Sequence, residues 1–368
     1  MLVDSLLKLS SKAVAKGLEI DFYKNYDVSL EPPLSDNVFK ELTKITQNCS
    51  LVIAKKTGLK LNLSSFDHTS FACTEEDLQN LYLHDIRSLV IHLSLKVKRV
   101  IKEEEEMSFK CRFVSDKECQ MICRSFPNLT CLEVSCFNMK SLNEIHRLTN
   151  LQTLILYCNS FNPWDGSEVL FKLPNLRILE VPVSHNFFKN LSLCHGTFPS
   201  LRFIECKRSD INEAQLRQLI AQHPSLEAIS VLKTPCERID FSDLPITVFN
   251  MTTFESTMNT LCYKLDERSL DWDRVNELLG RLEELFGNKD VRGFEEDDFL
   301  KTMMKVTQKI LRLSPRGIQM EKCLVAYFKR FFPDQSMTEI LQNLDPKDPL
   351  LIERRWAAQT VLRFFPEE

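Results

Sequence analysis

The sequence predicts an α/β solenoid, in which short repeats stack side by side, with helical segments before and after them. Three observations lead to this prediction: a leucine pattern recurs at an almost constant interval, two amphipathic stretches precede it, and a purely helical periodicity follows it. Hydrophobic residues make up 43% of the 368 residues, which is enough apolar material for a large core. We therefore expect three domains, at 1–48, 49–250 and 251–368.

The first domain should contain two amphipathic helices. One is expected from about Val3 to Gly17, because apolar residues recur on one side of it and glycine commonly ends a helix. The other should begin at Ser35, whose hydroxyl can cap it, and continue to Ile45. Considered by themselves, the two helices could simply cover the first repeat.

The second domain is defined by the pattern Leu-x-x-Leu-x-Leu with aliphatic substitutions. Successive first leucines lie 22, 25, 25 and 25 residues apart, at Leu129, Leu151, Leu176, Leu201 and Leu226. Leucine-rich repeats span roughly 20–29 residues, so the pattern predicts a horseshoe arc with strands on its concave face and helices or turns behind. An earlier copy fits at Leu78–Leu83, and a still earlier strand is expected at Leu59–Leu63.

Alternate positions along each strand point to opposite faces of the sheet. The repeated aliphatic residues should therefore face the core, and the positions between them should face outward on the concave side. These outward positions form the candidate substrate face: Glu133, Ile155, Tyr157, Glu180 and Glu205. Ile155 and Tyr157 are the best candidates for an apolar contact, although ordinary scattered exposure explains them equally well.

The third domain should be entirely helical. From about Thr252 the apolar residues recur at intervals of three and four, as in the stripe Val275, Leu278, Leu279, Leu282, Leu285 and Phe286. Three more such stripes follow, separated by Pro315, Pro333 and Pro349. Stacked helices of this length resemble an armadillo-type array. A helical cap that closes the end of the repeat arc is the alternative.

The composition argues against an enzyme. The chain has only 8 glycines, and neither GxGxxG nor GxxxxGK(S/T) occurs. The 13 cysteines include no CxxC pair, and the histidines have no metal-ligand spacing, so we expect neither metal nor cofactor. No nucleophile–base pair is recognisable, so we expect no catalytic residues.

Charge and hydrophobicity also restrict the partners. The net charge of -4 gives no overall positive field to hold nucleic acid. No run of eighteen or more apolar residues is present, so we expect no membrane-spanning helix. The N-terminal stretch lacks the apolar core of a secretory signal, which predicts a cytoplasmic or nuclear protein with reduced cysteines.

Two short motifs near the N-terminus resemble known binding boxes. Ser5, Leu6, Ser10 and Val14 match the elongin-binding box, with Ser10 where the box normally has cysteine. The segment with Leu34, Ser35, Val38 and Leu42 resembles the cullin-2 box, with Ser35 in place of the usual proline. Together with the repeats and the helical end, this layout resembles the Zyg-eleven/Zer family of substrate receptors for elongin–cullin-2 ubiquitin ligases.

The resemblance implies an adaptor that recruits protein substrates for ubiquitination. Its implied partners are elongin C, together with elongin B, and cullin-2. Leu6 would fill an apolar pocket on elongin C, with Ser10 and Val14 further along the same helix face. Val38 and Leu42 would present the second helix to the cullin. The helical domain of the family is normally longer and recognises glycine at protein N-termini, so this ligand is not carried over.

Two alternatives remain open from the sequence. One is an F-box receptor, because Pro32-Pro33 followed by Val38 and Leu42 faintly resembles that motif. An F-box would need further helices downstream, whereas strand-like alternation begins by Leu59. The other alternative is a leucine-rich-repeat scaffold without a ligase partner, in which Ser10 marks a degenerated box.

Overall fold

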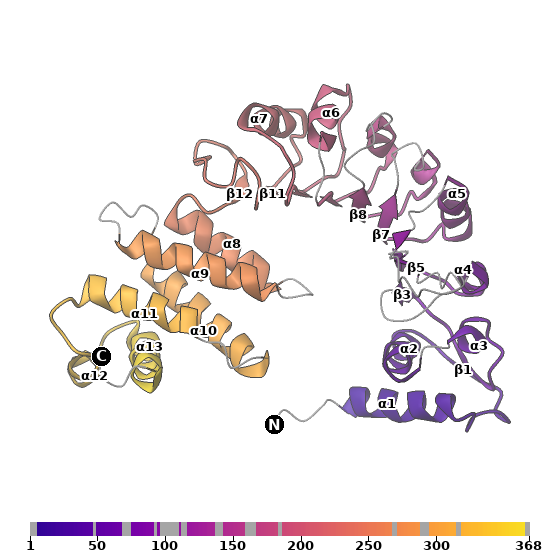
Figure 1. Cartoon of the computed structure of the whole chain (residues 1–368), viewed down its shortest axis with the longest axis horizontal. Coiled ribbons are helices and arrows are strands. Elements are labelled where there is room, and N and C mark those ends of the chain that lie inside the picture. The colour runs from indigo at the N-terminus through magenta and orange to yellow at the C-terminus, as the bar shows by residue number, and fades with distance from the viewer. Residues whose placement is uncertain are drawn as a thin grey trace, which may run out of the picture. The chain divides into compact units, whose positions relative to one another are not determined.

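The computed structural model shows a mixed α/β chain (Figure 1). Contacts between residues divide it into two compact units, Met1–Ile229 and Ser230–Glu368. The described residues are 6–46, 49–67, 75–91, 94–95, 110–111, 116–136, 143–158, 167–182, 186–266, 271–287, 294–313 and 318–364.

The first unit begins with two helices that pack against each other, α1 (Leu6–Glu19) and α2 (Leu34–Ile45). A third, short helix and two paired strands complete this region: α3 (Ser50–Ile53), β1 (Val28–Leu30) and β2 (Leu59–Leu61). The helix α1 runs past Gly17, contrary to the prediction. Gly17 lies close to the ring of Tyr23, and a Cβ there would lie 2.5 Å from a ring carbon, so the ring would have to shift.

Within the described residues, eight strands form one sheet in the order β12-β11-β10-β9-β8-β7-β4-β3. The neighbouring pairs from β3 to β10 are parallel. The strands are β3 (Ser65–Asp67), β4 (Ser88–Ile91), β7 (Cys131–Cys136), β8 (Thr153–Cys158), β9 (Ile178–Glu180), β10 (Phe203–Glu205), β11 (Ala228–Ser230) and β12 (Thr247–Phe249).

Helical segments connect the parallel strands of the first unit, as a repeat of strand and helix requires. They are α4 (Glu75–Asn80), η2 (Leu81–Leu83), α5 (Asp116–Ser125), η4 (Ile145–Arg147), η5 (Ser167–Lys172), α6 (Phe187–Leu193) and α7 (Glu213–Gln222). A short antiparallel pair, β5 (Ser94–Leu95) with β6 (Lys110–Cys111), lies between β4 and β7 in the sequence.

One predicted repeat copy is wrong. Leu78 lies in α4 and Leu81–Leu83 forms a turn of 3₁₀ helix, because leucines three residues apart suit a helix as well as a repeat strand. The strand of that repeat is β4, and it pairs directly with β7. The earlier strand expected near Leu59 is confirmed as β2.

The repeated aliphatic residues form the core of the first unit, as predicted. They lie on the buried face of β7, β8, β9 and β10, where at most 1% of each residue is exposed: Leu132, Val134, Leu154, Leu156, Leu179 and Ile204. The first leucine of each of these repeats is also fully buried. Burial of this row holds adjacent repeats together, because no single repeat could cover its own apolar side.

The second unit is largely helical, as the apolar stripes predicted. Its helices are α8 (Phe254–Asp266), α9 (Trp272–Gly287), α10 (Glu296–Leu313), α11 (Ile318–Phe331), α12 (Met337–Asn343) and α13 (Leu351–Phe364). Apart from Leu285, which is partly buried, the stripe of α9 is buried, and it meets aromatic residues that include Phe254, Phe299 and Tyr327. No helix in the described part of the chain is both long and apolar enough to cross a membrane.

Candidate functional site

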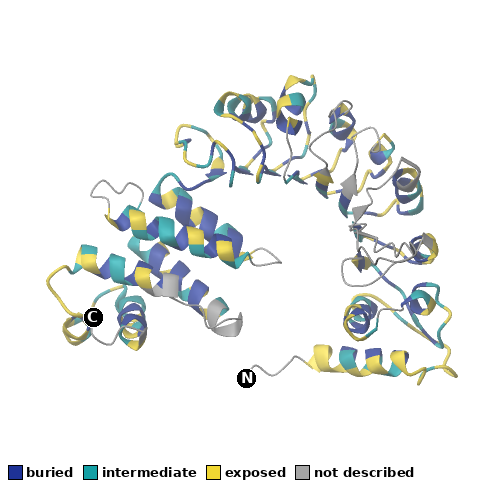
Figure 2. Cartoon of the chain, in the orientation of Figure 1, coloured by how far each residue is buried: buried dark blue, intermediate teal, exposed yellow. Residues whose placement is uncertain are grey.

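The exposed surface of α1 carries several apolar side chains, beside charged residues such as Lys8 and Lys16. Ser11, Ala15 and Leu18 are buried on its other face, which packs against α2. Leu6 is 80% exposed, and Leu7 and Leu9 are each about half exposed. Figure 2 shows this exposed outer side of α1 in yellow.

Three of the four elongin-box positions lie within the described part of α1, and Ser5 lies outside it. Leu6 and Ser10 are exposed, and Val14 is half-buried. The hydroxyl of Ser10 donates a hydrogen bond to the carbonyl oxygen of Leu6 at 2.8 Å. The polar hydrogen is therefore already satisfied within the helix, which lowers the cost of covering Ser10 with an apolar partner surface.

The cullin-box residues of α2 lie differently from the expectation. Ser35, Val38 and Leu42 are at most 2% exposed, and Leu34 is half-buried. The expectation that Val38 and Leu42 face a partner is therefore wrong for this conformation, because both side chains pack inside the first unit. The exposed residues of α2 include Lys40, Lys44 and Ile45 instead.

Ser35 does not cap α2. The cap position is held by Pro33, and Ser35 lies one residue inside the helix. Its hydroxyl donates a hydrogen bond of 2.6 Å to the carbonyl oxygen of Asn62, at the end of the β2 segment. Ser35, which stands in place of the proline usual in this box, thus links α2 to a segment 27 residues further along the chain.

Sequence reasoning missed a second exposed apolar group, which follows α1. Ile20, Phe22, Tyr26 and Val28 are all exposed, and the rings of Phe22 and Tyr26 stack with centroids 6.3 Å apart. In the described part of the chain, nine of the fifteen exposed large apolar side chains lie between positions 6 and 51. This concentration of apolar surface is typical of a protein-interaction site. The aromatic residues of the segment are the signal that could have indicated it.

Four residues of the candidate substrate face lie in one row across adjacent strands. Glu133 is in register with Ile155, Ile155 with Glu180, and Glu180 with Glu205. Glu205 is only 4% exposed and accepts a hydrogen bond from the backbone of Lys207 at 3.1 Å. Glu205 therefore lies in the predicted row, on the opposite side of its strand from the buried Ile204, but it is largely covered.

Tyr157 lies next to this row and is 37% exposed. Burial raises the pKa of its phenol to about 12, and the negative charges of Glu133 and Glu180 contribute in the same direction. Tyr157 therefore stays a neutral hydrogen-bond donor at physiological pH. The row can offer a partner carboxylates, a phenol and one aliphatic side chain.

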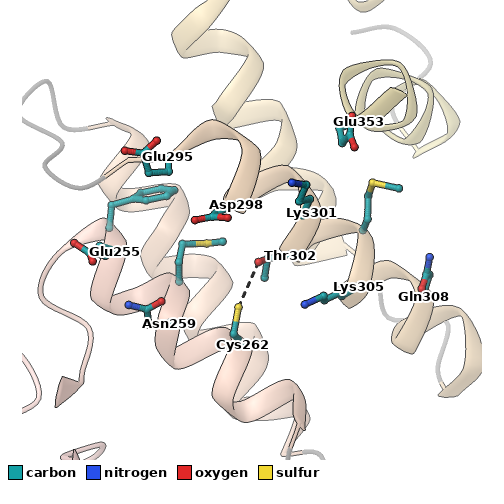
Figure 3. A pocket seen from close by; sticks show the side chains of 13 residues that line it. Glu255, Asn259, Cys262, Glu295, Asp298, Lys301, Thr302, Lys305, Gln308 and Glu353 are labelled. Carbon is teal, nitrogen blue, oxygen red and sulfur yellow. Dashed lines mark hydrogen bonds between the residues drawn. The ribbon is translucent and has the colours of Figure 1, made fainter. Parts of the chain in front are cut away.

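A groove of about 680 Å³ lies in the second unit, between α8 and α10, with Glu353 of α13 also lining it (Figure 3). The thiol of Cys262 on α8 lies 3.4 Å from the hydroxyl of Thr302 on α10, inside the groove. Sequence reasoning did not predict this groove, because its residues belong to helices about forty positions apart.

The described chain thus combines an exposed apolar helix, a mostly parallel sheet and a largely helical second unit. No protein-family model matches the chain. It is 22% identical over 376 aligned residues to Gastrulation-defective protein 3 of Caenorhabditis elegans. The match covers 86% of this chain and 52% of the worm protein, so the chain spans about half the length of that relative.

Proposed function

We propose that the chain is a substrate-recognition subunit of an elongin–cullin-2 ubiquitin ligase, and that α1 is its contact with elongin C. In this proposal the strand-and-helix repeats are a leucine-rich-repeat solenoid with a horseshoe arc. The second unit is an armadillo-like helical domain. The subunit performs no bond chemistry of its own, because holding a substrate near the ubiquitin-loaded enzyme raises its effective concentration.

The exposed apolar face of α1 is the observation that supports this proposal best. Leu6, Ser10 and Val14 are spaced four residues apart and therefore share one helix face. A helix whose other face packs on its own unit can place this face in an apolar groove of a partner. Leu6 would be the central contact, because it is the most exposed large apolar residue in the described part of the chain.

The remaining partners in this proposal are elongin B, which accompanies elongin C, cullin-2 and the protein substrates. A cullin contact from α2 would use exposed residues such as Lys40, Lys44 and Ile45. The row that contains Glu133, Ile155 and Glu180, with Tyr157 beside it, is the proposed substrate face.

The burial of Val38 and Leu42 favours a second candidate function. Without these side chains at the surface, the resemblance to a cullin-2 box loses its apolar contacts. The chain would then be a repeat scaffold that binds proteins but joins no ligase.

The proposal can be tested by capture of the full chain with purified elongin B–C and cullin-2. Leu6→Ser should weaken elongin capture by about 1–3 kcal/mol, the usual cost of losing a central interface residue. The double variant Leu6→Ala/Val14→Ala should abolish capture. Leu193→Ala is the matched control, because Leu193 is 66% exposed on α6 and outside α1.

Loss of capture in the α1 variants but not in the control would support the receptor function. If the wild-type chain binds neither elongin B–C nor a Skp-type adaptor, the ligase role is wrong and the scaffold function remains. Binding to the Skp-type adaptor alone would instead support the F-box alternative.

A further inference from the structure

The groove of the second unit has an apolar floor. Phe254 and Met258 line it from α8, and Met304 lines it from α10. Methionine side chains are unbranched and polarisable, so they adapt to apolar side chains of different shapes. The volume of about 680 Å³ lies within the usual range of roughly 300–1,000 Å³ for ligand pockets.

The walls of the groove carry more carboxylates than ammonium groups. Glu255, Glu295 and Asp298 gather at one end, as Figure 3 shows, and Glu353 is a fourth carboxylate. Among the described residues, the three gathered carboxylates have no ion-pair partner within 4.0 Å. This end of the groove therefore carries more negative than positive charge, although Lys301 on the same helix interacts electrostatically with Asp298.

The two lysines of the groove balance only part of the charge of its four carboxylates. Lys301 already forms an ion pair with Asp297 on the same helix, and Lys305 lies one turn further along α10. The pKa of Lys301 is raised, first by its hydrogen bond to Asp297 and then by the charges of Asp297, Glu353 and Asp298. The raised pKa is a second sign of negative potential along this face.

We propose that this groove binds a basic, amphipathic peptide segment of a partner protein. A Lys or Arg side chain of the segment would lie among Glu255, Glu295 and Asp298, and a neighbouring apolar side chain would pack on the floor. Charge complementarity selects this occupant, because an acidic segment would meet unpaired carboxylates. The inference goes beyond the proposed ligase role and does not depend on it.

Binding of the full chain to labelled peptides tests the inference, with fluorescence anisotropy as the measurement. Three peptides of equal length would be compared, with alternating Arg and Leu, alternating Glu and Leu, and alternating Arg and Ser. All three peptides have acetylated N-termini, so no free α-amine adds a positive charge to the binding. We expect saturable binding of the Arg–Leu peptide alone, and weaker binding as the salt concentration rises.

The variant Glu255→Lys/Asp298→Lys should lower the affinity for the Arg–Leu peptide by about tenfold or more. Asp273→Lys is the matched control, because Asp273 also lies in the first turn of its helix, α9, but does not line the groove. Glu255→Gln/Asp298→Asn, which only neutralises the charges, should lower the affinity less. It replaces Glu255→Lys/Asp298→Lys if that variant does not fold. Met304→Ala should weaken binding without changing its salt dependence.

Several results would overturn the inference. They are absence of wild-type binding to the Arg–Leu peptide, equal binding of the Arg–Ser or Glu–Leu peptide, and equal affinity of the charge variants and the Asp273→Lys control. Elongin capture is measured with α1 variants on the other unit, so failure of one proposal is distinguishable from failure of the other.

Discussion

His223 shows how burial changes a single ionisable residue. It follows α7 in the first unit, is 1% exposed, and lies beside the rings of Phe171 and Phe198. Its Nδ1 accepts a hydrogen bond from the backbone N–H of Phe198 at 3.4 Å, so the ring is neutral in the folded chain. Burial lowers the pKa of His223 from 6.5 to about 4.

The stability of the chain should therefore decrease in mild acid. Below the unfolded pKa of 6.5 the unfolded chain binds a proton that the folded chain does not bind. As the pH falls from 6.5 to 4, the free energy of unfolding should decrease by up to about 3 kcal/mol. Above pH 6.5 His223 is neutral in both states, so no stability is lost there. Urea unfolding followed by circular dichroism, at a series of pH values, measures the change.

His223→Gln should remove this part of the pH dependence, because glutamine can accept the hydrogen bond but does not titrate. His146→Gln changes an exposed histidine and serves as the control. An identical pH slope in wild type and His223→Gln would contradict the assignment.

The α1 and α2 residues show what the sequence could predict about the candidate site. The exposed position of Leu6 was predictable from its place in the motif resembling an elongin-binding box, whose leucine would face a partner. The burial of Val38 and Leu42 was not, because it depends on contacts with segments that are distant in the sequence. The hydrogen bond from Ser35 to Asn62 is one such contact, and no local pattern indicates it.

At the scale of whole elements, one ionic network joins three helical segments of the second unit. Both carboxylate oxygens of Glu296 on α10 accept hydrogen bonds from Arg354 on α13, at 2.9 and 2.7 Å. Tyr327 on α11 donates to the same carboxylate. Arg354 also contacts Asp348, which precedes α13, at 2.5 Å. The guanidinium group of Arg354 thus donates hydrogen bonds to two carboxylates, those of Glu296 and Asp348.

Arg354→Ala should lower the free energy of unfolding by about 2 kcal/mol, because it leaves two partly buried carboxylates without their cation. Arg354→Lys should recover only part of this loss, since an ammonium group cannot form the two-pronged contact. Thermal or urea unfolding measures both. Arg355→Ala is the control on the exposed side of the same helix. Similar effects of Arg354→Ala and Arg355→Ala would show that the network adds no stability.

The repeat strands were predictable as elements, and the connections between them were less so. The leucine spacing placed β7, β8, β9 and β10 correctly, because their buried residues alternate with a fixed period. It failed at Leu78–Leu83, where the same spacing of leucines fits a helix. The pattern alone could not distinguish a helix from a strand at this position, because that depends on which strand pairs with β7, and β4 does so.

At the scale of the whole molecule, contacts between residues divide the chain into two compact units, and the second unit has an apolar core cluster of its own. The core cluster of the second unit is built from residues between Leu232 and Val361. A local destabilisation in this unit should therefore not spread to the repeats of the first unit.

Hydrogen exchange followed by mass spectrometry tests this separation. In Arg354→Ala, exchange should increase in α10, α11 and α13 and stay unchanged in β7 to β10. Elongin capture through α1 should also be unchanged in this variant. Faster exchange in the β7 to β10 strands would show instead that both units unfold together.

The packing of α1 on α2 has a consequence for the speed of association. Ser11, Ala15 and Leu18 hold α1 in helical form on the unit itself. A partner protein would therefore bind a helix that is already formed. The slow and unfavourable nucleation of its first turn takes place before the two proteins meet. If Leu6 is the elongin contact proposed above, recognition requires docking only, so its rate is set by diffusion and orientation and not by folding of the segment.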